Sequence, residues 1–486
     1  MILQLNHLHG KQAGASAQDV VSAVYSLLEE GHLDESQFAN LRVHLDWVQY
    51  RQNFREVVTV TQCVNERGET VPVMEIRVDT RQVAPGTLRE QMLCALAETS
   101  PAAGEIKRTP ERIYLEPFVS FRSSIAWQFN RLYWHRLADW EQATGKGYEE
   151  ALPGGKSDAN HPEAIADCVA DFWTLLRDLE TKNQLPPEIF ILEIGVGMGT
   201  RSRIWLDRFK ALDAERGTQY YPRVKFLLGD YSLATLDRSR PALREHLDLC
   251  SFIVLDALDP GKTLAFLRHK VLHVHLTNVY DNLPDEEFAR RDGRLHLVQA
   301  RAYVPHSDAA RISKAFDVAT SQLSSTVQRL LESGPESLGD RARGVSFWQE
   351  VWKAVRLEER LVCLEDLPDV ELPAGLNATH LEEILEKAPS EFRFHMSSGA
   401  LESFRNTLSL LHPRGFLQVQ DIFVTGLNDY RLGFHGPGKL DGSIVNWVNG
   451  VLLREVGERA GYDVHFAPFR YREGSRTSIL YTTQRE

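Results

Sequence analysis

Short apolar runs separated by helical periodicity dominate the chain beyond Pro187. This alternation is typical of a parallel sheet with helices on both faces, because each strand is then buried on both sides. The connection around Gly474 is too short for a crossover helix, so we expect the last two runs to pair antiparallel, whereas the earlier runs have room for right-handed crossovers. Seven strands are predicted: Ile189–Ile194, Val224–Leu228, Phe252–Leu255, Val271–Leu276, Phe416–Phe423, Tyr462–Phe466 and Thr477–Tyr481.

The chain before these strands divides into two further units. Residues 1–115 hold helical patterns and a candidate hairpin, Val57–Gln62 with Val71–Val78, and are predicted to form a small α+β extension. Residues 116–185 are predicted to be a helical linker or lid region. Within them, the aromatic run from Phe118 to Trp140 is either a packing face or the wall of a ligand site.

The predicted sheet is interrupted between its fourth and fifth strands. Its core comprises residues 186–300 and 411–486, and residues 301–410 are predicted to be a helical insertion, since Phe347 and Val351 recur at helical spacing. An insertion at this place would lie over the carboxyl ends of the strands, where open α/β sheets bind ligands, so we expect a substrate cap. The predicted fold class is α/β, a Rossmann-like doubly wound seven-stranded sheet.

Composition and charge exclude several classes of function. The 486 residues include 55 Lys and Arg against 67 Asp and Glu, and the net charge of −12 gives no general attraction for nucleic-acid phosphates. The five cysteines lie far apart without a CxxC pair, so neither a disulfide framework nor a thiolate zinc site is indicated. No stretch approaches the ~20 apolar residues that span a bilayer, and the N-terminus lacks a signal-peptide pattern. We therefore expect a cytoplasmic protein without a nucleic-acid or membrane partner.

A glycine-rich turn after the first predicted strand is the strongest local signal. Its glycines let the backbone bend sharply and approach a ligand, and the helix that follows presents unpaired N–H groups to an anion. A dinucleotide site would need a glycine at Thr200, so S-adenosylmethionine (SAM) is favoured over NAD; a turn that binds nothing is the other alternative. The candidate cofactor contacts here are Glu193, Gly195, Gly197, Gly199 and Thr200.

Acidic residues also follow the second and third predicted strands. Asp230 can accept hydrogen bonds from both hydroxyls of a ribose, with Tyr231 beside it, although an acid at a helix start is also favoured by the helix dipole. Asp256 can accept from the adenine amino group while Ala257 packs on the ring, unless Asp256 is an ordinary turn residue. These four residues complete the predicted cofactor contacts on this side.

The end of the fourth predicted strand supplies the candidate catalytic residues. Asn278 and Asp281 fall at the top of the sheet, where a methyl donor must point, and can orient an acceptor nitrogen or oxygen. Asn278 is also a predicted cofactor contact, and Tyr280 can supply a ring wall. The alternative is that Asn278 and Asp281 only form a tight turn, since such loops also favour Asn and Asp.

Three histidines are further candidates. His435, in a glycine-rich loop after the fifth strand, is either a general base for the methyl acceptor or an exposed loop residue. His273 and His275 alternate on the fourth strand and point to one face. Two His residues without a third ligand nearby in the sequence do not make a metal site, so none is predicted.

These motifs resemble those of class I SAM-dependent methyltransferases, and most of all the MidA-like family, which includes mitochondrial complex I assembly arginine methyltransferases. Residues 193–200 match that family's E-x-G-x-G-x-G-T, residues 230–233 stand where it has an acidic residue and a Ser-Pro-Ser-Leu-like turn, and residues 278–284 resemble its Asn-Glu…Asp-Ala-Leu-Pro. The family's Glu is Val279 here, and its N-terminal Gly-Asp-Phe-x-Thr-Ser signature has no counterpart. Arginine as the acceptor is therefore not carried over.

The function expected from the sequence is SAM-dependent methyl transfer, by in-line displacement, to an unidentified acceptor that is a protein side chain or a small molecule. Because the residues outside the core are extensive and the family's Glu is missing, a catalytically silent SAM-binding assembly factor is an alternative. An NAD(P)-dependent oxidoreductase is a second one. The sequence leaves the oligomeric state open.

Overall fold

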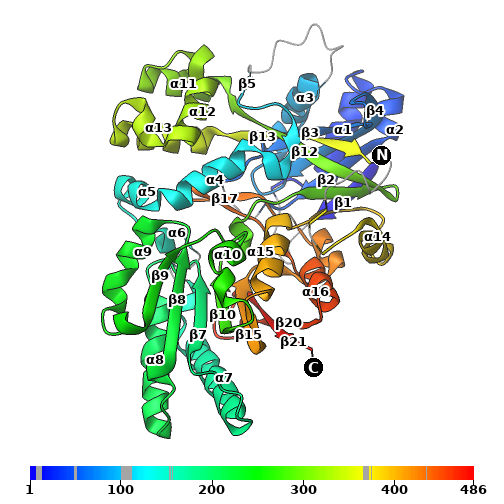
Figure 1. Cartoon of the computed structure of the whole chain (residues 1–486). Helices are drawn as coiled ribbons and strands as arrows, with labels where there is room; N and C mark the ends of the chain where they lie inside the picture. The colour runs from blue at the N-terminus through cyan, green and yellow to red at the C-terminus, as the bar shows by residue number, and fades with distance from the viewer. Residues whose placement is uncertain are drawn as a thin grey trace.

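The computed structural model contains two large β-sheets with helices around them (Figure 1). One has seven strands and the other has ten, and two short two-stranded sheets accompany them. The structure describes residues 1–6, 14–48, 52–99, 112–152, 155, 157–364, 372–373, 375–433 and 435–485.

All seven strands predicted from the sequence lie in the seven-stranded sheet. The five neighbouring strands from β15 to β9 run parallel, and β21 runs antiparallel to both β15 and β20. In spatial order the strands are β20 (Tyr462–Pro468), β21 (Ser478–Gln484), β15 (Leu411–Asp421), β10 (Val271–Thr277), β7 (Ile189–Ile194), β8 (Val224–Asp230) and β9 (Cys250–Val254).

The middle of this sheet is a topological switch point. From β7 the chain continues to β8 on one side, and it later returns to β10 on the other side. The carboxyl ends of these three strands are level, because Ile194 pairs with both Gly229 and Leu276. In open α/β sheets a ligand binds outside such a point, so the residues that follow these strands are placed around one site.

Helices cover both faces of the seven-stranded sheet. One face packs against α7 (Pro162–Thr181) and α8 (Thr200–Arg216), with Trp205 and Phe209 of α8 fully buried. These two aromatic residues are four positions apart, so they fall on the same face of the helix. The other face packs against α15 (Ser398–Leu408) and α16 (Gly450–Arg459), and α10 (Pro260–Thr263) contacts α15.

The ten-stranded sheet joins the N-terminal part of the chain to the segment between β10 and β15. The predicted hairpin is present as the antiparallel pair β3 and β4, and β3 pairs with β13 from the distant segment. The main path is β1 (Ile2–Asn6), β2 (Leu41–Asp46), β4 (Thr70–Asp79), β3 (Val58–Val64), β13 (Arg356–Cys363), β12 (Arg294–Pro305), β11 (Glu287–Arg291) and β14 (Phe392–His395), while β5 (Arg112–Tyr114) and β6 (Val119–Ser120) pair with β12.

The second sheet changes two of the predicted boundaries. Strands β11 and β12 belong to this sheet, although the sequence assigned residues up to 300, which include β11 and most of β12, to the core of the other sheet. Residues 301–410, predicted to be helical, contribute strands β13 and β14 as well as helices. These strands pair with segments far away in the chain, and local periodicity carries no information about such partners.

Helices also surround the space between the two large sheets. The segment from α4 to α6 runs across this space (Figure 1), next to a hairpin formed by β17 (Gly438–Leu440) and β18 (Ser443–Val445). The remaining helices are α1 (Ala17–Glu29), α2 (Glu35–Ala39), α3 (Leu88–Thr99), α4 (Ile125–His135), α5 (Leu137–Thr144), α6 (Tyr148–Ala151), α9 (Leu233–Ser239), α11 (His306–Phe316), α12 (Leu323–Ser333), α13 (Arg341–Ala354) and α14 (Ala378–Glu386). Among the described residues, no helix is both long enough and apolar enough to cross a bilayer.

Candidate active site

A cavity of about 980 Å³ lies at the carboxyl ends of β7, β8, β9 and β10. Small-molecule sites span roughly 300–1,000 Å³, so this cavity is large enough for a cofactor and part of an acceptor together. Its walls come from the glycine turn, the ends of the neighbouring strands, helices α4 and α6, the β17–β18 hairpin and the loop 472–477 between β20 and β21.

The glycine turn forms one wall of the cavity. Gly195, Gly197 and Gly199 all have left-handed backbone angles, with φ of 78°, 54° and 72°. A Cβ at Gly195 would stand 2.6 Å from Val279 Cγ2, and one at Gly197 would stand 2.8 Å from the Tyr148 hydroxyl. Only glycine combines this backbone with so close an approach, and the residue that occupies the space above Gly197 is Tyr148.

Helix α8 begins at the end of this turn. Gly199 is its N-cap and supplies no side-chain hydrogen bond, so the N–H groups of the first turn of the helix are uncapped. Thr200, the first helical residue, lines the cavity. The predicted anion-facing helix start is therefore present at the edge of the cavity.

Asp230 lies beside the glycine turn, where the sequence placed the ribose contact. Its carboxylate oxygens accept the N–H groups of Gly197 at 3.3 Å and Ser232 at 3.0 Å. Burial raises the pKa of Asp230 to about 6. Each oxygen has a second lone pair, so the carboxylate can accept two further hydrogen bonds from the cavity.

The other predicted cofactor contacts on this side also line the cavity. The Tyr231 hydroxyl accepts a hydrogen bond from Arg131 Nε at 2.6 Å. This bond links α4 to the residue that follows β8, and both residues line the cavity. Asp256 and Ala257 follow β9 and line the cavity. Asp256 also accepts the N–H of Leu258 at 2.9 Å, so the turn role considered for it is present as well.

Glu193 and Arg201 form a buried ion pair under the glycine turn. Arg201 Nη1 lies 3.1 Å from Glu193 Oε2, and the Ser202 hydroxyl donates to the same oxygen at 2.8 Å. Each of the two charged residues is 4% exposed, and both line the cavity. Glu193 is therefore at the predicted place, with a cationic partner that the sequence analysis missed.

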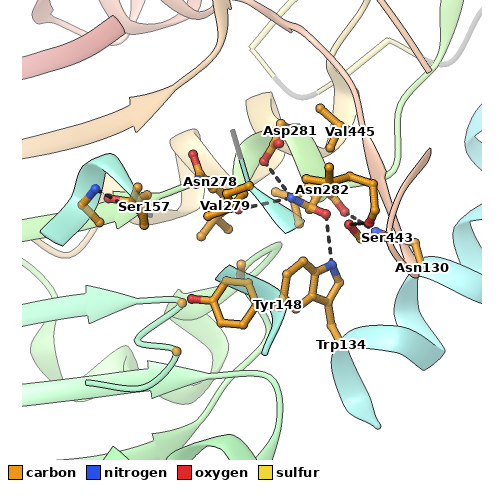
Figure 2. Close-up of a pocket in the computed structure, with 18 of the residues that line it drawn as sticks. Asn130, Trp134, Tyr148, Ser157, Asn278, Val279, Asp281, Asn282, Ser443 and Val445 are labelled. Atoms are coloured by element: carbon orange, nitrogen blue, oxygen red, sulfur yellow. Dashed lines mark hydrogen bonds between the residues drawn. The ribbon is translucent and has the colours of Figure 1, made fainter. Parts of the chain in front are cut away.

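The turn after β10 brings Asn278 and Asp281 to the cavity. Asn278 adopts a left-handed backbone with φ of 51°, which Asn tolerates better than most residues. The Asn282 amide donates to Asp281 Oδ1 at 2.8 Å and to the Asn278 carbonyl at 3.2 Å, and it accepts from Trp134 Nε1 at 3.0 Å. Figure 2 shows the rings of Tyr148 and Trp134 facing this turn across the cavity.

A second carboxyl group, from Asp421 at the end of β15, holds the same turn from below. Its Oδ2 accepts the N–H groups of Tyr280 at 2.9 Å and Asp281 at 3.2 Å. Burial raises the pKa of Asp421 to about 7, and burial together with the neighbouring Asp421 charge raises the pKa of Asp281 well above its usual range. The Asp281 carboxyl therefore takes up a proton more readily than an exposed Asp does, and in its protonated form it is a hydrogen-bond donor.

Two predicted catalytic residues lie outside the cavity. Tyr280 is 2% exposed and packs in the apolar core, because the short 3₁₀ turn that directs Asp281 toward the cavity directs Tyr280 away from it. His435 lines a different cavity of about 30 Å³, together with His44, Glu287 and His395. Burial lowers its pKa to about 4. The predictions that Tyr280 forms a ring wall and that His435 is the general base are therefore wrong.

His273 and His275 are buried and pack against neighbouring side chains of the sheet. Their rings lie 6.2 Å apart, and His273 stacks on Phe416. The His275 ring forms a hydrogen bond with the Gln418 side chain, with 3.2 Å between Nδ1 and Oε1. Within the part of the chain that the structure describes, no group of three or more His, Cys, Asp or Glu is arranged to hold a metal ion.

Four residues of the site were missed by sequence reasoning. Trp134 belongs to the aromatic run that was left open between packing and ligand wall, so its signal was present. Tyr148, Arg201 and Asn282 had no signal, because their positions depend on how α6, α8 and the turn after β10 meet in space.

No protein-family model matches the chain, and no curated protein matches it. Among solved structures, an uncharacterised superfamily protein from Burkholderia thailandensis has 12% sequence identity and a TM-score of 0.43, over 76% of this chain and 87% of that chain. Another member of that superfamily from Burkholderia thailandensis, described as a candidate methyl transferase bound to S-adenosyl-homocysteine, has 14% identity and a TM-score of 0.44, over 76% and 88%. An O-methyltransferase family protein from the same organism has 11% identity and a TM-score of 0.32, over 84% and 75%. These similarities are weak, so the function of this chain has to follow from its own geometry.

Proposed function

We propose that this chain is a SAM-dependent methyltransferase of class I type, with a methyl acceptor that is a protein side chain or a small molecule. One observation carries the proposal. A single cavity at the switch point of the seven-stranded sheet joins the glycine turn after β7, Asp230 at the end of β8 and Asn278 after β10. This arrangement supplies a place for an adenosyl group and a place for an acceptor next to it.

The residues present fit an S-adenosyl cofactor. Asp230 has lone pairs left for the two ribose hydroxyls, and Asp256 and Ala257 supply a polar and an apolar edge for the adenine. The uncapped start of α8 favours a carboxylate. Tyr148 lies against Gly197, so this side chain has to move or to pack against the cofactor.

The chemistry follows from positioning. When bound, SAM supplies a methyl group on a sulfonium, which is already a good leaving group. The chain's own part is to align the acceptor, and the Asn278 amide and the Asp281 carboxyl line the cavity where that alignment takes place. Asn282 holds both of them through its amide. Residues of α4 and α6 also line this cavity.

Two other functions compete with this proposal. A SAM-binding protein without catalytic activity would keep the cofactor contacts but not need the bonded turn at Asn278–Asn282. A dinucleotide-dependent oxidoreductase would need a glycine where Thr200 lines the cavity. We also propose that the protein works in the reducing cytoplasm. This compartment fits the cysteines, which are all free: Cys63, Cys94, Cys168, Cys250 and Cys363.

Binding and transfer experiments separate the three functions. Isothermal titration of the purified protein with S-adenosylhomocysteine (SAH), NADH and NADPH should give binding of SAH alone. Incubation of a cell extract with the protein and isotopically labelled SAM, followed by mass spectrometry, should then reveal a labelled product. Asp281→Ala should keep most of its SAH affinity and lose the transfer. Tighter binding of NADH or NADPH would select the oxidoreductase, and SAH binding without any labelled product would select the silent factor.

A further inference from the structure

The buried pair Glu193–Arg201 lines the cavity, and one N–H donor of the pair has no hydrogen-bond partner among the described residues. Arg201 is 4% exposed and lines the cavity from the first turn of α8. Its Nη1 is paired with Glu193, and its Nη2 lies 3.9 Å from the sulfur of Cys168, which is a weak acceptor. Its Nε is buried without a hydrogen-bond partner in the described structure.

A buried guanidinium with an unpaired N–H donor lowers the stability of the folded protein. A guanidinium carries five N–H donors in a planar fork, and a buried donor left unpaired is unfavourable relative to one that is paired. The 17-residue helix that carries Arg201 also begins with uncapped N–H groups at the cavity, where Thr200 lines the wall. Two independent features, a spare cationic donor and a helix N-terminus, therefore favour an anion at this point.

Glu193 narrows the chemical class of that anion. A simple anion would be repelled by the carboxylate 3.1 Å from the guanidinium. A zwitterion is favoured instead, because its carboxylate can meet Arg201 while its ammonium meets Glu193. The α-amino carboxylate of an amino acid has this pair of charges on one carbon, and it forms one end of the S-adenosyl cofactor.

We propose that Arg201, oriented by Glu193, is the residue that recognises the α-carboxylate of the cofactor's amino-acid arm. This inference rests on the proposed function. It assigns Arg201 a role in selecting between adenosyl compounds: those that carry the amino-acid arm bind tightly, and those that end in a plain thioether bind weakly. A purely structural Arg201 would serve only to neutralise Glu193 and would not distinguish these ligands.

The test compares ligands as well as variants. Isothermal titration of the wild-type protein uses SAH, its decarboxylated form S-adenosyl-3-thiopropylamine, and 5′-methylthioadenosine, which lacks the whole arm. Loss of the carboxylate from the ligand should weaken binding to the wild type by about tenfold or more, the range of a charge-assisted hydrogen bond. Because this comparison needs no variant, it does not depend on how well a variant folds.

The variant Arg201→Gln should lose a similar factor for SAH and change by less than about twofold for 5′-methylthioadenosine. Arg201→Lys should recover part of the SAH affinity. The matched control is Arg203→Gln on the same helix, since Arg203 is 44% exposed and pairs with the exposed Asp207. This control should bind all three ligands like the wild type.

Two results overturn the inference while leaving the proposed function intact. One is equal affinity of the wild type for SAH and its decarboxylated form. The other is a parallel loss of SAH and 5′-methylthioadenosine binding in Arg201→Gln, which would indicate a structural role only. A wild-type protein that binds none of the three adenosyl compounds overturns the proposed function, and the inference with it.

Discussion

The pH dependence of cofactor binding should report the titration of Asp230. Burial raises the pKa of this carboxyl to about 6 in the protein without cofactor. Only the ionised carboxylate can accept both ribose hydroxyls, so protonation weakens binding, and the affinity should fall as the pH drops through about 6. With one titrating group at that pKa, about nine tenths of the protein is competent at pH 7 and about one tenth at pH 5, which predicts a loss of roughly tenfold.

The variant Asp230→Asn removes this titration. Its amide retains one acceptor oxygen, so SAH affinity at pH 7 should fall by about 1–3 kcal/mol, and the remaining affinity should be nearly flat between pH 5 and 8. Isothermal titration with SAH in buffers across that range measures both effects. The control is Asp237→Asn on α9, whose side chain is 59% exposed. If Asp230→Asn kept the wild-type slope with pH, Asp230 would not be the ribose contact.

Three further changes have defined outcomes. Gly197→Ala places a Cβ 2.8 Å from the Tyr148 hydroxyl at a left-handed backbone position, so both SAH affinity and melting temperature should fall. Adding Tyr148→Phe should restore part of both losses, because it removes that hydroxyl. If the double variant recovered nothing, the close approach of Gly197 and Tyr148 would be contradicted. Asp421→Asn removes one of two buried acids whose stabilising contribution is present at low pH and lost as the pH rises through the raised pKa of about 7. Urea unfolding of the wild type should therefore weaken between pH 5 and 8 by up to about 1.4 kcal/mol per pH unit, and that of the variant should weaken less; equal slopes would refute this. Asn282→Ala removes the bonds to Trp134, Asp281 and the Asn278 carbonyl, so the free energy of unfolding should drop by about 1–3 kcal/mol in chemical denaturation, whereas an unchanged value would show that the turn does not depend on this amide.

The seven-stranded sheet was predictable because its signals are local. Central strands such as β7 and β10 are buried on both faces and therefore read as short apolar runs, and the short connection around Gly474 allows only an antiparallel return. Apart from the β3–β4 hairpin, the ten-stranded sheet was not predictable. Its strand β13 pairs with β3, which lies in a distant part of the chain. Its strands β2 and β4 also carry buried charged residues, such as Glu75 and Arg77, which a hydrophobic pattern does not recognise as core.

The same distinction applies to the candidate site. The residues that directly follow β7, β8, β9 and β10 were found, since the ends of parallel strands meet at one edge of the sheet. Tyr280 and His435 were misplaced for different reasons. The orientation of Tyr280 depends on one turn of 3₁₀ helix, and His435 lies on a loop whose path is set by tertiary packing. Arg201 and Tyr148 were missed because their role comes from contacts between separate elements.

The most direct test of a cofactor site at the glycine turn is photochemical labelling. Ultraviolet irradiation of the purified protein with radiolabelled SAM, followed by peptide mapping, marks the residues that touch the cofactor. Label should be found in the peptides that contain residues 193–201 and 230–231, and excess unlabelled SAH should suppress it. Label that is absent, or that is confined to peptides remote from the cavity, would contradict the proposed site.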